Sequence, residues 1–374
     1  MNFVSEFKKG LLGKNIGVTT GLDVLDKAIN GIQKAQYIGI GAASKAGKTS
    51  LCDYCFLLSP YLESISKNLD IEWVYFSFEI DRVSKEFKLI PFFFRHDYNI
   101  INFKYKDKTY PICPNYIKGC LLDEDGEIVK MSEEHINIVK EIYIKRIIPL
   151  FGKYNEQGVR IQKGKVDFID NKSDFNPTGI RNYLMNHAEQ RGKFVKQAYQ
   201  TKENGQTVNK EKIISYLPNN PDKLVIVIQD HMRNCPNERG FTNKQNIDKL
   251  SEYFVILRDL IKYTFVGISH INRNIGSIER LKYNNEFIHP TDSDFKESGC
   301  MAEDCTALLT LFNANDETYN IKKHFGLVLK GDNDEEYYPN YRSLHLTHSR
   351  FTECPQHMQL NMYGNTNYFE KLIT

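Results

Sequence analysis

The sequence predicts an α/β fold in which helices flank a central, mostly parallel β-sheet. Short apolar segments alternate along the chain with segments of helical periodicity, which is typical of a parallel sheet. Residues 224–228 (Leu-Val-Ile-Val-Ile) are continuously apolar, as in a strand that is covered on both faces. A loop containing Gly47 and Lys48 follows the first apolar segment, as a phosphate-binding loop would.

The core elements are expected in an order that alternates strands with helices. Strands are predicted at 37–41, 73–78, 224–228, 264–269, 307–312 and 343–347. Helices are predicted from Lys48 onward and over 247–262, and Leu22, Leu25 and Ile29 share a helical face before the first strand. Residues 97–222 have weaker periodicity. There we expect helices at 132–148 and 178–191, with hairpins, inserted between two core strands.

Composition restricts the classes of function. Of the 374 residues, 41% are hydrophobic, which is enough for a sizeable core. The 49 basic and 47 acidic residues leave a net charge of +2, so any contact with DNA must come from local loops. No apolar run approaches the roughly 18 residues that a membrane span needs, and the first residues lack a signal-peptide pattern. We therefore expect no membrane contact and a cytoplasmic location.

The eight cysteines are expected to be reduced thiols. Cys52 and Cys55 could be a metal or redox pair, but two small apolar residues on a buried helix are the simpler interpretation. Cys113 and Cys120 lie in a turn-rich stretch, where a metal site is the alternative to ordinary thiols. Residues 123–126 (Asp-Glu-Asp-Gly) resemble a calcium loop, but the glycine comes too early, so a hairpin turn is expected.

Residues 42–49 (Ala-Ala-Ser-Lys-Ala-Gly-Lys-Thr) fit the phosphate-loop pattern with alanine in its first position. Small residues let backbone N–H groups surround the phosphates, and Lys48 would reach the β and γ oxygens. The Thr49 hydroxyl would bind Mg²⁺, and the following helix directs its positive end at the anion. The sequence therefore predicts that ATP and Mg²⁺ bind here. The residues assigned to nucleotide binding are Ala43, Ser44, Lys45, Ala46, Gly47, Lys48, Thr49 and Ser50.

Three polar residues follow other predicted strands. Glu79 could orient and deprotonate the attacking water, the alternative being an ordinary surface glutamate. Asp230 could hold Mg²⁺ through water, the alternative being a solvated strand-end aspartate. His270 could contact the γ-phosphate and report its loss, although a lone histidine is more often structural.

These segments resemble the ATPase domain of the DnaB-type replicative helicases, in the RecA-like group of P-loop NTPases. The matching segments, in order, are 17–26, 30–33, the phosphate loop, 76–79, 230–231 and 268–273. The most specific match is Pro290 followed by 294–299 and then Glu303-Asp304. The resemblance implies a RecA-like ATPase domain at 17–374, with an N-terminal arm at 1–16 and the insertion at about 97–222. The Asp-His pair at 230–231 is similar to phage members, which suggests an enzyme of the bacterial host cytoplasm.

The family's last motif places a lysine and an arginine two residues apart, and they enter the neighbouring subunit's site. His348 and Arg350 occupy these positions here, so the resemblance implies that Arg350 is a finger supplied in trans. His348 departs from the pattern and carries less positive charge at neutral pH. The alternative for Arg350 is an exposed strand-end arginine.

These helicases usually carry an N-terminal domain that binds primase and steadies the ring, whereas about 16 residues precede the core here. Phe3, Phe7, Leu11 and Leu12 could form an amphipathic arm that packs on a neighbouring subunit. The insertion or a separate protein would then replace the roles of that domain.

The family threads single-stranded DNA over the loops that follow Asp230 and His270. The first loop, 231–246, has a net charge of +2, whereas the second, 272–299, has a net charge of −1. The candidate DNA contacts are Arg233, Arg239, Lys244, Arg273, Arg280 and Lys282. The alternative is that these are solvated loop residues.

The resemblance implies an ATP-driven replicative helicase of the 5′-to-3′ type. It would form a hexameric ring on single-stranded DNA, hydrolyse ATP at subunit interfaces, and have a primase or a loader as a further partner. A RecA-like recombinase that forms filaments on single-stranded DNA is one alternative. A regulatory ATPase that uses nucleotide only to assemble is another, against which Glu79 argues, because an assembly switch needs no hydrolytic base.

Overall fold

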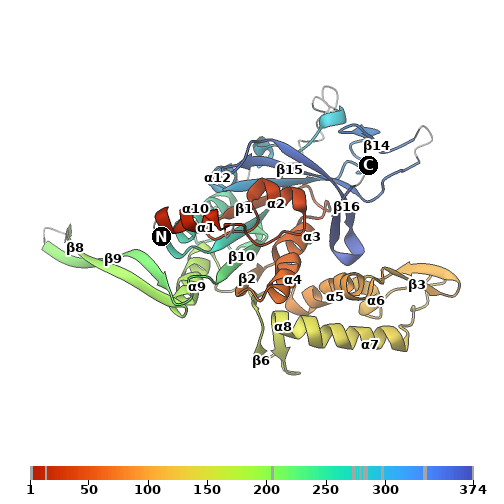
Figure 1. Ribbon diagram of the computed structural model, residues 1–374, viewed down its shortest axis with the longest axis horizontal. Coiled ribbons are helices and arrows are strands. Elements are labelled where there is room, and N and C mark those ends of the chain that lie inside the picture. The colour runs from red at the N-terminus through yellow and green to blue at the C-terminus, as the bar shows by residue number, and fades with distance from the viewer. Residues whose placement is uncertain are drawn as a thin grey trace.

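The computed structural model describes residues 3–12, 15–203, 206–271, 275, 277, 280, 285–295, 299–331 and 335–372. In this part of the chain a nine-stranded sheet has the order β17-β16-β15-β12-β1-β11-β10-β2-β7 (Figure 1). The parallel strands are β1 (Tyr37–Ala42), β2 (Ile71–Ser77), β7 (Val166–Ile169), β10 (Leu224–Asp230), β11 (Thr264–His270) and β12 (Ala307–Phe312). The antiparallel strands at one end are β15 (Tyr341–Ser349), β16 (Gln356–Tyr363) and β17 (Tyr368–Lys371). The predicted α/β fold with a mostly parallel sheet is confirmed.

The central strands are apolar on both faces because helices cover both. On β10, Ile226 and Ile228 belong to one core cluster, whereas Val225 and Val227 belong to the other. This alternation follows from the period of two along a strand. It explains why the segment 224–228 has no polar position.

Different helices cover the two faces. The first core cluster includes residues of α3 (Lys48–Cys52), the π-helical segment η1 (Asp53–Leu58), α4 (Ser59–Ser66) and α5 (Arg82–Tyr98). The second includes residues of α9 (Pro177–Glu189), α10 (Asn243–Ile261) and α12 (Gly299–Asp304). Helix α10 begins with a capping box formed by Thr242 and Gln245, and it buries the apolar stripe that its sequence predicts.

The region 97–222 contains the two predicted helical segments. One comprises α7 (Glu133–Ile142), the π-helical η2 (Tyr143–Ile147) and α8 (Ile148–Phe151), and the other is α9. The hairpins are β3 (Asn102–Tyr105) with β4 (Lys108–Pro111), β5 (Gly152–Tyr154) with β6 (Arg160–Lys163), and β8 (Gly192–Glu203) with β9 (Gln206–Pro218). One element was not expected there, because β7 pairs with β2 and therefore belongs to the central sheet.

The remaining elements are short. They are α1 (Phe3–Leu11), α2 (Asp23–Ile29), α6 (Pro114–Ile117), η3 (Met232–Asn234), η5 (Asn285–Phe287), η6 (Asp292–Asp294), η7 (Gly364–Thr366), β13 (Lys323–His324) and β14 (Leu327–Val328). In the predicted arm, α1 exposes Phe7 and Leu11, and Leu12 beyond it is exposed too. None of the described helices has both the length and the hydrophobicity that crossing a bilayer requires.

The predictions of free thiols, of a buried Cys52 and Cys55, and of a turn at 123–126 are confirmed. All eight cysteines are free thiols, and Cys52 and Cys55 are buried in the core beneath the phosphate loop. Among the described residues, neither Cys113 nor Cys120 belongs to a group of side chains that could hold a metal ion. At 123–126 the chain turns, and Leu122 and Ile128 form an antiparallel bridge across that turn.

Candidate active site

Four neighbouring parallel strands end at one edge of the sheet, and the predicted site residues lie there. The phosphate loop follows β1, Glu79 lies just past β2, and Asp230 and His270 are the last residues of β10 and β11. The register aligns these ends, since Asp230 pairs with Ser77 and His270 pairs with Ala42. The carboxyl edge of a parallel sheet is where open α/β folds bind ligands.

The phosphate loop turns sharply before α3 begins at Lys48. Lys45 and Gly47 have positive φ angles of 62° and 105°, a conformation that glycine adopts at little cost. The buried Lys48 ammonium lies 3.2 Å from the Ala43 carbonyl oxygen and 3.2 Å from Nδ1 of His270. Lys48 and His270, the two side chains that the sequence predicts to contact phosphate, are therefore in contact with each other.

Thr49 and Asp230 form a corner suited to a hard cation. The Thr49 hydroxyl donates to Oδ1 of Asp230 at 3.2 Å, and Asp230 is 1% exposed. Hydroxyl and carboxylate oxygens are the ligands that Mg²⁺ prefers. Asp230 accepts hydrogen bonds from the hydroxyl groups of Thr49 and Tyr75, and among the described residues it has no ammonium or guanidinium partner. These residues fit the ion that the sequence predicts.

Glu79 contacts His231, a residue that the sequence pattern marks only as part of the Asp-His pair at 230–231 and not as a partner of Glu79. Nε2 of His231 lies 3.0 Å from Oε2 of Glu79 and 3.4 Å from Oδ1 of Asp230. The His231 ring stacks on His270, with centroids 4.6 Å apart and an interplanar angle of 3°. The Glu79 side chain is 52% exposed. Its carboxylate is therefore accessible to water on one side while His231 orients it from the other.

Burial controls the protonation of these groups. Burial lowers the pKa of Lys48 to about 8, an effect that the charges of Glu79 and Asp230 oppose. Burial, and then the charge of Lys48, lower the pKa of His270 to about 4. Burial also lowers the pKa of His231. At neutral pH the stacked histidines are therefore neutral and Lys48 is mostly charged, so the site's positive charge is concentrated at the phosphate loop.

A buried polar network lies behind Asp230, and no sequence pattern predicts it. The Tyr75 hydroxyl lies 3.2 Å from Oδ2 of Asp230 and 3.0 Å from Oδ1 of Asp53. Lys85 donates to that hydroxyl at 2.6 Å and pairs with Asp53 at 2.7 Å, and Lys88 lies 3.5 Å from Asp53. A phenol has one hydrogen. Because Asp53 already accepts from ammonium groups, that hydrogen is best used by Asp230, and Tyr75 then fixes the orientation of its carboxylate.

Two residues of the antiparallel strands reach the phosphate loop. Nε of Arg342 donates to the Ala46 carbonyl at 3.3 Å. The end of the Met362 side chain lies so close to Gly47 that a Cβ at position 47 would displace it, and the φ of 105° at Gly47 would itself strain a larger residue. No motif marks either residue, since each is brought to the loop from about 300 residues away in the chain.

Arg350 lies at the opposite end of the parallel strands, where β1 and β12 begin. It follows β15, its backbone N–H donates to Thr306 at 2.9 Å, and its exposed guanidinium contacts the Glu303 carbonyl at 3.3 Å. Thr306 is hydrogen-bonded to Tyr37, the first residue of β1, so Arg350 lies beside the start of β1. The phosphate loop follows the end of β1, six residues and roughly 20 Å away. Arg350 therefore cannot reach the phosphate site of its own chain.

The predicted DNA-contact residues fall into three groups. Arg233, Arg239 and Lys244 are exposed and follow β10, and the acid in their loop, Glu238, pairs with Lys249 of α10. Arg280 pairs at 2.6 Å with the buried Asp294, and it also contacts the His289 carbonyl. Arg273 and Lys282 lie outside the described residues.

The motif that begins at Asp294 fastens the second loop to the sheet. The Asp294 carboxylate accepts from Arg280 and from the Thr291 backbone. The buried Phe295 ring lies against Gly41 of β1, where a Cβ would collide with it. The described part of this motif is therefore structural.

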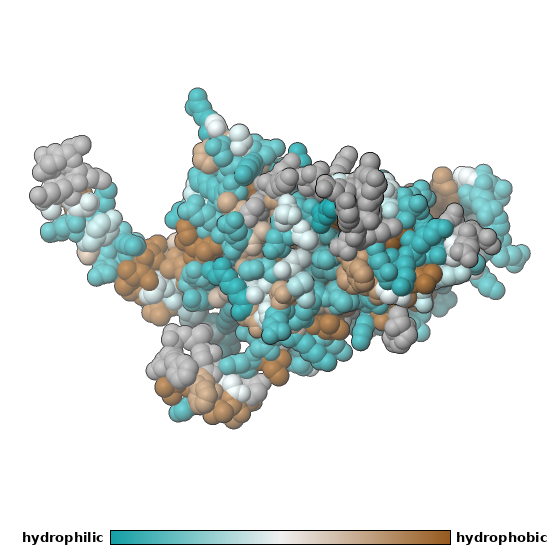
Figure 2. Space-filling view, turned by 90° about the horizontal axis from the view of Figure 1, so that it is seen from above, coloured by the Kyte–Doolittle hydropathy of each residue, from teal (hydrophilic) through white to brown (hydrophobic). Residues whose placement is uncertain are grey.

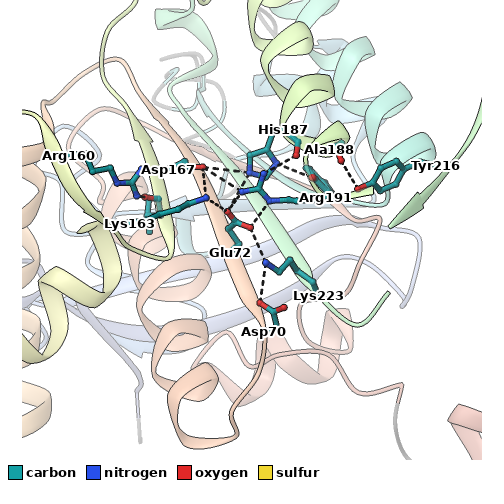
Figure 3. Close-up of polar contacts among 12 residues, drawn as sticks. Asp70, Glu72, Arg160, Lys163, Asp167, His187, Ala188, Arg191, Tyr216 and Lys223 are labelled. Atoms are coloured by element: carbon teal, nitrogen blue, oxygen red, sulfur yellow. Dashed lines mark hydrogen bonds and ion pairs between the residues drawn. The ribbon is translucent and has the colours of Figure 1, made fainter. Parts of the chain in front are cut away.

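A second cluster of possible metal ligands, Glu72, Asp167 and His187, lies near the opposite edge (Figure 3). Figure 3 shows that its carboxylates are surrounded by cations. Arg191 binds Glu72 through two nitrogens, one of them at 2.8 Å, and Lys163 and Lys223 lie 3.2 and 3.3 Å from the same carboxylate. Although burial raises the pKa of Glu72, its bonds with His187 and Arg191 outweigh that effect and lower it. Since these cations already occupy the carboxylates, this cluster is an ion-pair network.

The comparisons with known proteins concern the fold. No protein-family model matches the sequence, and no curated protein matches it. Among solved structures, the chain is similar to one described as an ATPase domain, with 16% identity, a TM-score of 0.64 and coverage of 99% of this chain and 97% of that one. It is also similar to a DnaB-like replicative helicase described with its interactions with primase, at 16% identity and a TM-score of 0.63. This match covers 99% of this chain and 66% of that one. The chain therefore has the fold of these two structures, one an ATPase domain and the other a DnaB-like replicative helicase.

Proposed function

We propose that this chain is the motor of a DNA helicase, which hydrolyses ATP at the carboxyl edge of its sheet and moves along single-stranded DNA. The observation that carries the proposal is the convergence of Lys48, Thr49, Glu79, Asp230 and His270 from four separate strands on one edge. The likeness in fold to helicase ATPase domains supports it.

Each residue has a role in phosphoryl transfer to water. Lys48 and the backbone N–H groups of 43–49 bind the β- and γ-phosphates. Thr49 would hold Mg²⁺ directly and Asp230 would hold it through water, and the ion would neutralise charge on the phosphates. Glu79, oriented by His231, accepts the proton of the attacking water, and neutral His270 next to Lys48 senses the γ-phosphate.

The catalytic site is completed by a neighbouring copy. Arg350 is exposed at the edge opposite its own phosphate loop, which is the placement that a finger acting in trans requires. Head-to-tail contacts of this kind form a ring when the rotation between copies closes, and an open helical filament when it does not. We propose a hexamer whose exposed Arg233, Arg239 and Lys244 track the DNA backbone, with 5′-to-3′ movement as the resemblance implies.

The first test is the variant Lys48→Ala. Removal of the ammonium should abolish ATP turnover and strand unwinding on a forked DNA substrate, while thermal unfolding without nucleotide stays close to that of the parent. Normal turnover in this variant would contradict the assignment of the site.

Subunit mixing tests the shared interface. Arg350→Ala and Glu79→Gln should each be inactive, and Arg350→Ala should still bind ATP. Mixed rings contain interfaces at which an intact Glu79 meets an intact Arg350, so mixing should restore part of the activity. Mixtures without recovery would exclude a finger in trans, and open helical filaments with ATP and DNA in electron micrographs would favour a recombinase.

A further inference from the structure

An open pocket of about 500 Å³ lies at the amino ends of three neighbouring parallel strands, the ends opposite the ATPase site. Asp70, Lys165 and Lys223 come directly before β2, β7 and β10, and all three line it. The sheet holds them in place, because the Trp73 N–H donates to the Lys165 carbonyl at 2.9 Å and the Leu224 N–H donates to the Asp70 carbonyl at 3.0 Å. The volume is within the range of small-molecule sites. None of the roles proposed above uses this pocket.

Cations outnumber carboxylates in the lining of this pocket, most of which is drawn in Figure 3. Its charged side chains are the cations of Lys163, Lys165, Arg191 and Lys223 and the carboxylates of Asp70 and Glu72, a net charge of +2. The Asp167 carboxylate next to the pocket pairs with Arg160 at 2.7 Å, so that pair adds no net charge. The carboxylates of the ion-pair network are therefore saturated, whereas its cations are in excess.

The excess charge is centred on Lys165. Its ammonium contacts the Ser64 hydroxyl at 3.2 Å, and among the described residues no carboxylate lies within ion-pair distance of it. An ammonium has three N–H donors, so Lys165 has donors left for a ligand. Burial, and then the charge of Lys223, lower the pKa of Lys165, and the charge of Asp70 does not offset them. An anion in the pocket would therefore be attracted to Lys165.

The other cations of 140–165 differ from Lys165 in their surroundings. Four of them have carboxylate partners, which are Glu141 for Lys145, Asp97 for Arg146, Asp167 for Arg160 and Glu72 for Lys163. Lys140 and Lys153 are exposed, so water solvates their charges. Lys165 is partly buried and lacks such a partner among the described residues. The basic character of this stretch therefore becomes available to a ligand mainly in the pocket.

The pocket is polar, and apolar surface lies on the hairpin that begins beside it. Gln190 and Arg191 line the pocket and directly precede the β8–β9 hairpin. In Figure 2 this hairpin extends to the left and is apolar near its base, where Ile214 and Leu217 are exposed. Among the described residues that line the pocket, Ile71 is the only one with an apolar side chain, and it is buried. The pocket therefore favours a charged ligand over an apolar one.

We propose that this pocket binds a small molecule with a terminal phosphate or pyrophosphate group, which Lys165 contacts directly and Lys163 and Lys223 attract. A phosphate monoester carries a charge of about −1.5 to −2 at pH 7, which matches the excess charge of the lining. Lysine is a common point-charge partner of phosphate. The seven residues of β2 separate the pocket from the ATPase site by roughly 20 Å, so this is a second anion site, independent of the proposed motor.

The test measures pyrophosphate binding to the full chain by titration calorimetry without Mg²⁺. Every protein carries Lys48→Ala, so that the phosphate loop contributes little. Adding Lys165→Gln should raise the Kd about tenfold, because a hydrogen bond between charged groups is lost. Adding Asp70→Asn instead should lower the Kd about threefold, because one negative charge leaves the lining. The two variants therefore change the affinity in opposite directions, which general loss of structure would not do.

The matched control is Lys145→Gln, which removes a paired lysine of the same stretch and should leave the Kd unchanged. No pyrophosphate binding in the Lys48→Ala chain, or the same Kd with Lys165→Gln and Asp70→Asn, would overturn the proposal. Loss of DNA affinity in Lys165→Gln with pyrophosphate binding intact would also overturn it and assign the surface to a nucleic-acid backbone. With Lys48 intact, Lys165→Gln should hydrolyse ATP at the parent rate, so failure of the pocket is distinguishable from failure of the motor.

Discussion

Strand β2 connects two ionic clusters that look alike as sets of residues and differ in their partners. Glu79, Asp230 and His231 lie past its carboxyl end, and Glu72, Asp167 and His187 lie near its start. At the first cluster Asp230 accepts from hydroxyl groups, and Glu79 is half exposed. At the second, Arg191, Lys163 and Lys223 occupy Glu72. A carboxylate that has no cationic partner within the protein is available to bind a ligand, whereas a carboxylate that is ion-paired within the protein contributes to the stability of the fold.

The largest expected difference between the two clusters is in catalysis. Glu79→Gln should lower the rate constant for ATP hydrolysis by about 10²- to 10⁴-fold, because it removes the general base and keeps the shape of the side chain. ATP affinity should stay within about twofold of the parent in an equilibrium titration. Hydrolysis at the parent rate would make Glu79 an ordinary surface glutamate and remove the contrast.

The second cluster should respond in stability instead. Glu72→Gln removes the main charged partner of the partly buried Arg191, which keeps only Asp167 at 3.9 Å, so the free energy of unfolding should fall by about 3 kcal/mol in urea titrations. The rate of ATP hydrolysis below the unfolding transition should stay within twofold. Glu211→Gln removes an exposed pair with Lys196 and should change stability little. A large loss of turnover with unchanged stability in Glu72→Gln would reverse the roles of the clusters.

A third measurement uses the lowered pKa of Lys48. In the free protein this ammonium loses its proton near pH 8, whereas bound phosphates favour the charged form. ATP affinity should therefore fall about tenfold between pH 7 and pH 9, and binding near pH 8.5 should take up a proton, measurable by calorimetry in buffers of different ionisation enthalpy. Lys48→Arg does not titrate in this range, so the same slope in that variant would assign it to another group.

The smallest expected effect concerns the network behind Asp230. Tyr75→Phe removes one hydrogen bond to that carboxylate, worth about 1 kcal/mol, so the Mg²⁺ concentration for half-maximal hydrolysis should rise about fivefold. Tyr61→Phe is the control, since its hydroxyl binds the Arg146 carbonyl away from the site. An unchanged Mg²⁺ requirement in Tyr75→Phe would limit the network to a structural role.

The site residues that the sequence predicts most directly are those that follow predicted strands. Lys48 is marked by its loop, and Glu79, Asp230 and His270 by their positions after apolar strands, because parallel strands bring their carboxyl ends to one edge. The structure places all four at that edge, and their catalytic roles stay predictions.

The residues that the sequence did not reveal depend on contacts between distant segments. Tyr75 looks like an ordinary strand former until Asp53 and Lys85 are seen beside it. Strand β7 has four residues, too few for a clear period, so its place in the sheet was missed. Arg342 and Met362 reach the phosphate loop through antiparallel strands whose pairing no local pattern encodes.

The contact of Met362 with Gly47 has a consequence for folding and quality control. The loop and the strand that contacts it are separated by about 300 residues, so this contact forms only when nearly the entire described sequence has come together. A ligand that binds the loop only after this contact has formed stabilises molecules that have completed this step. Under the proposed function, ATP would then protect complete chains from proteolysis more than fragments that lack β16.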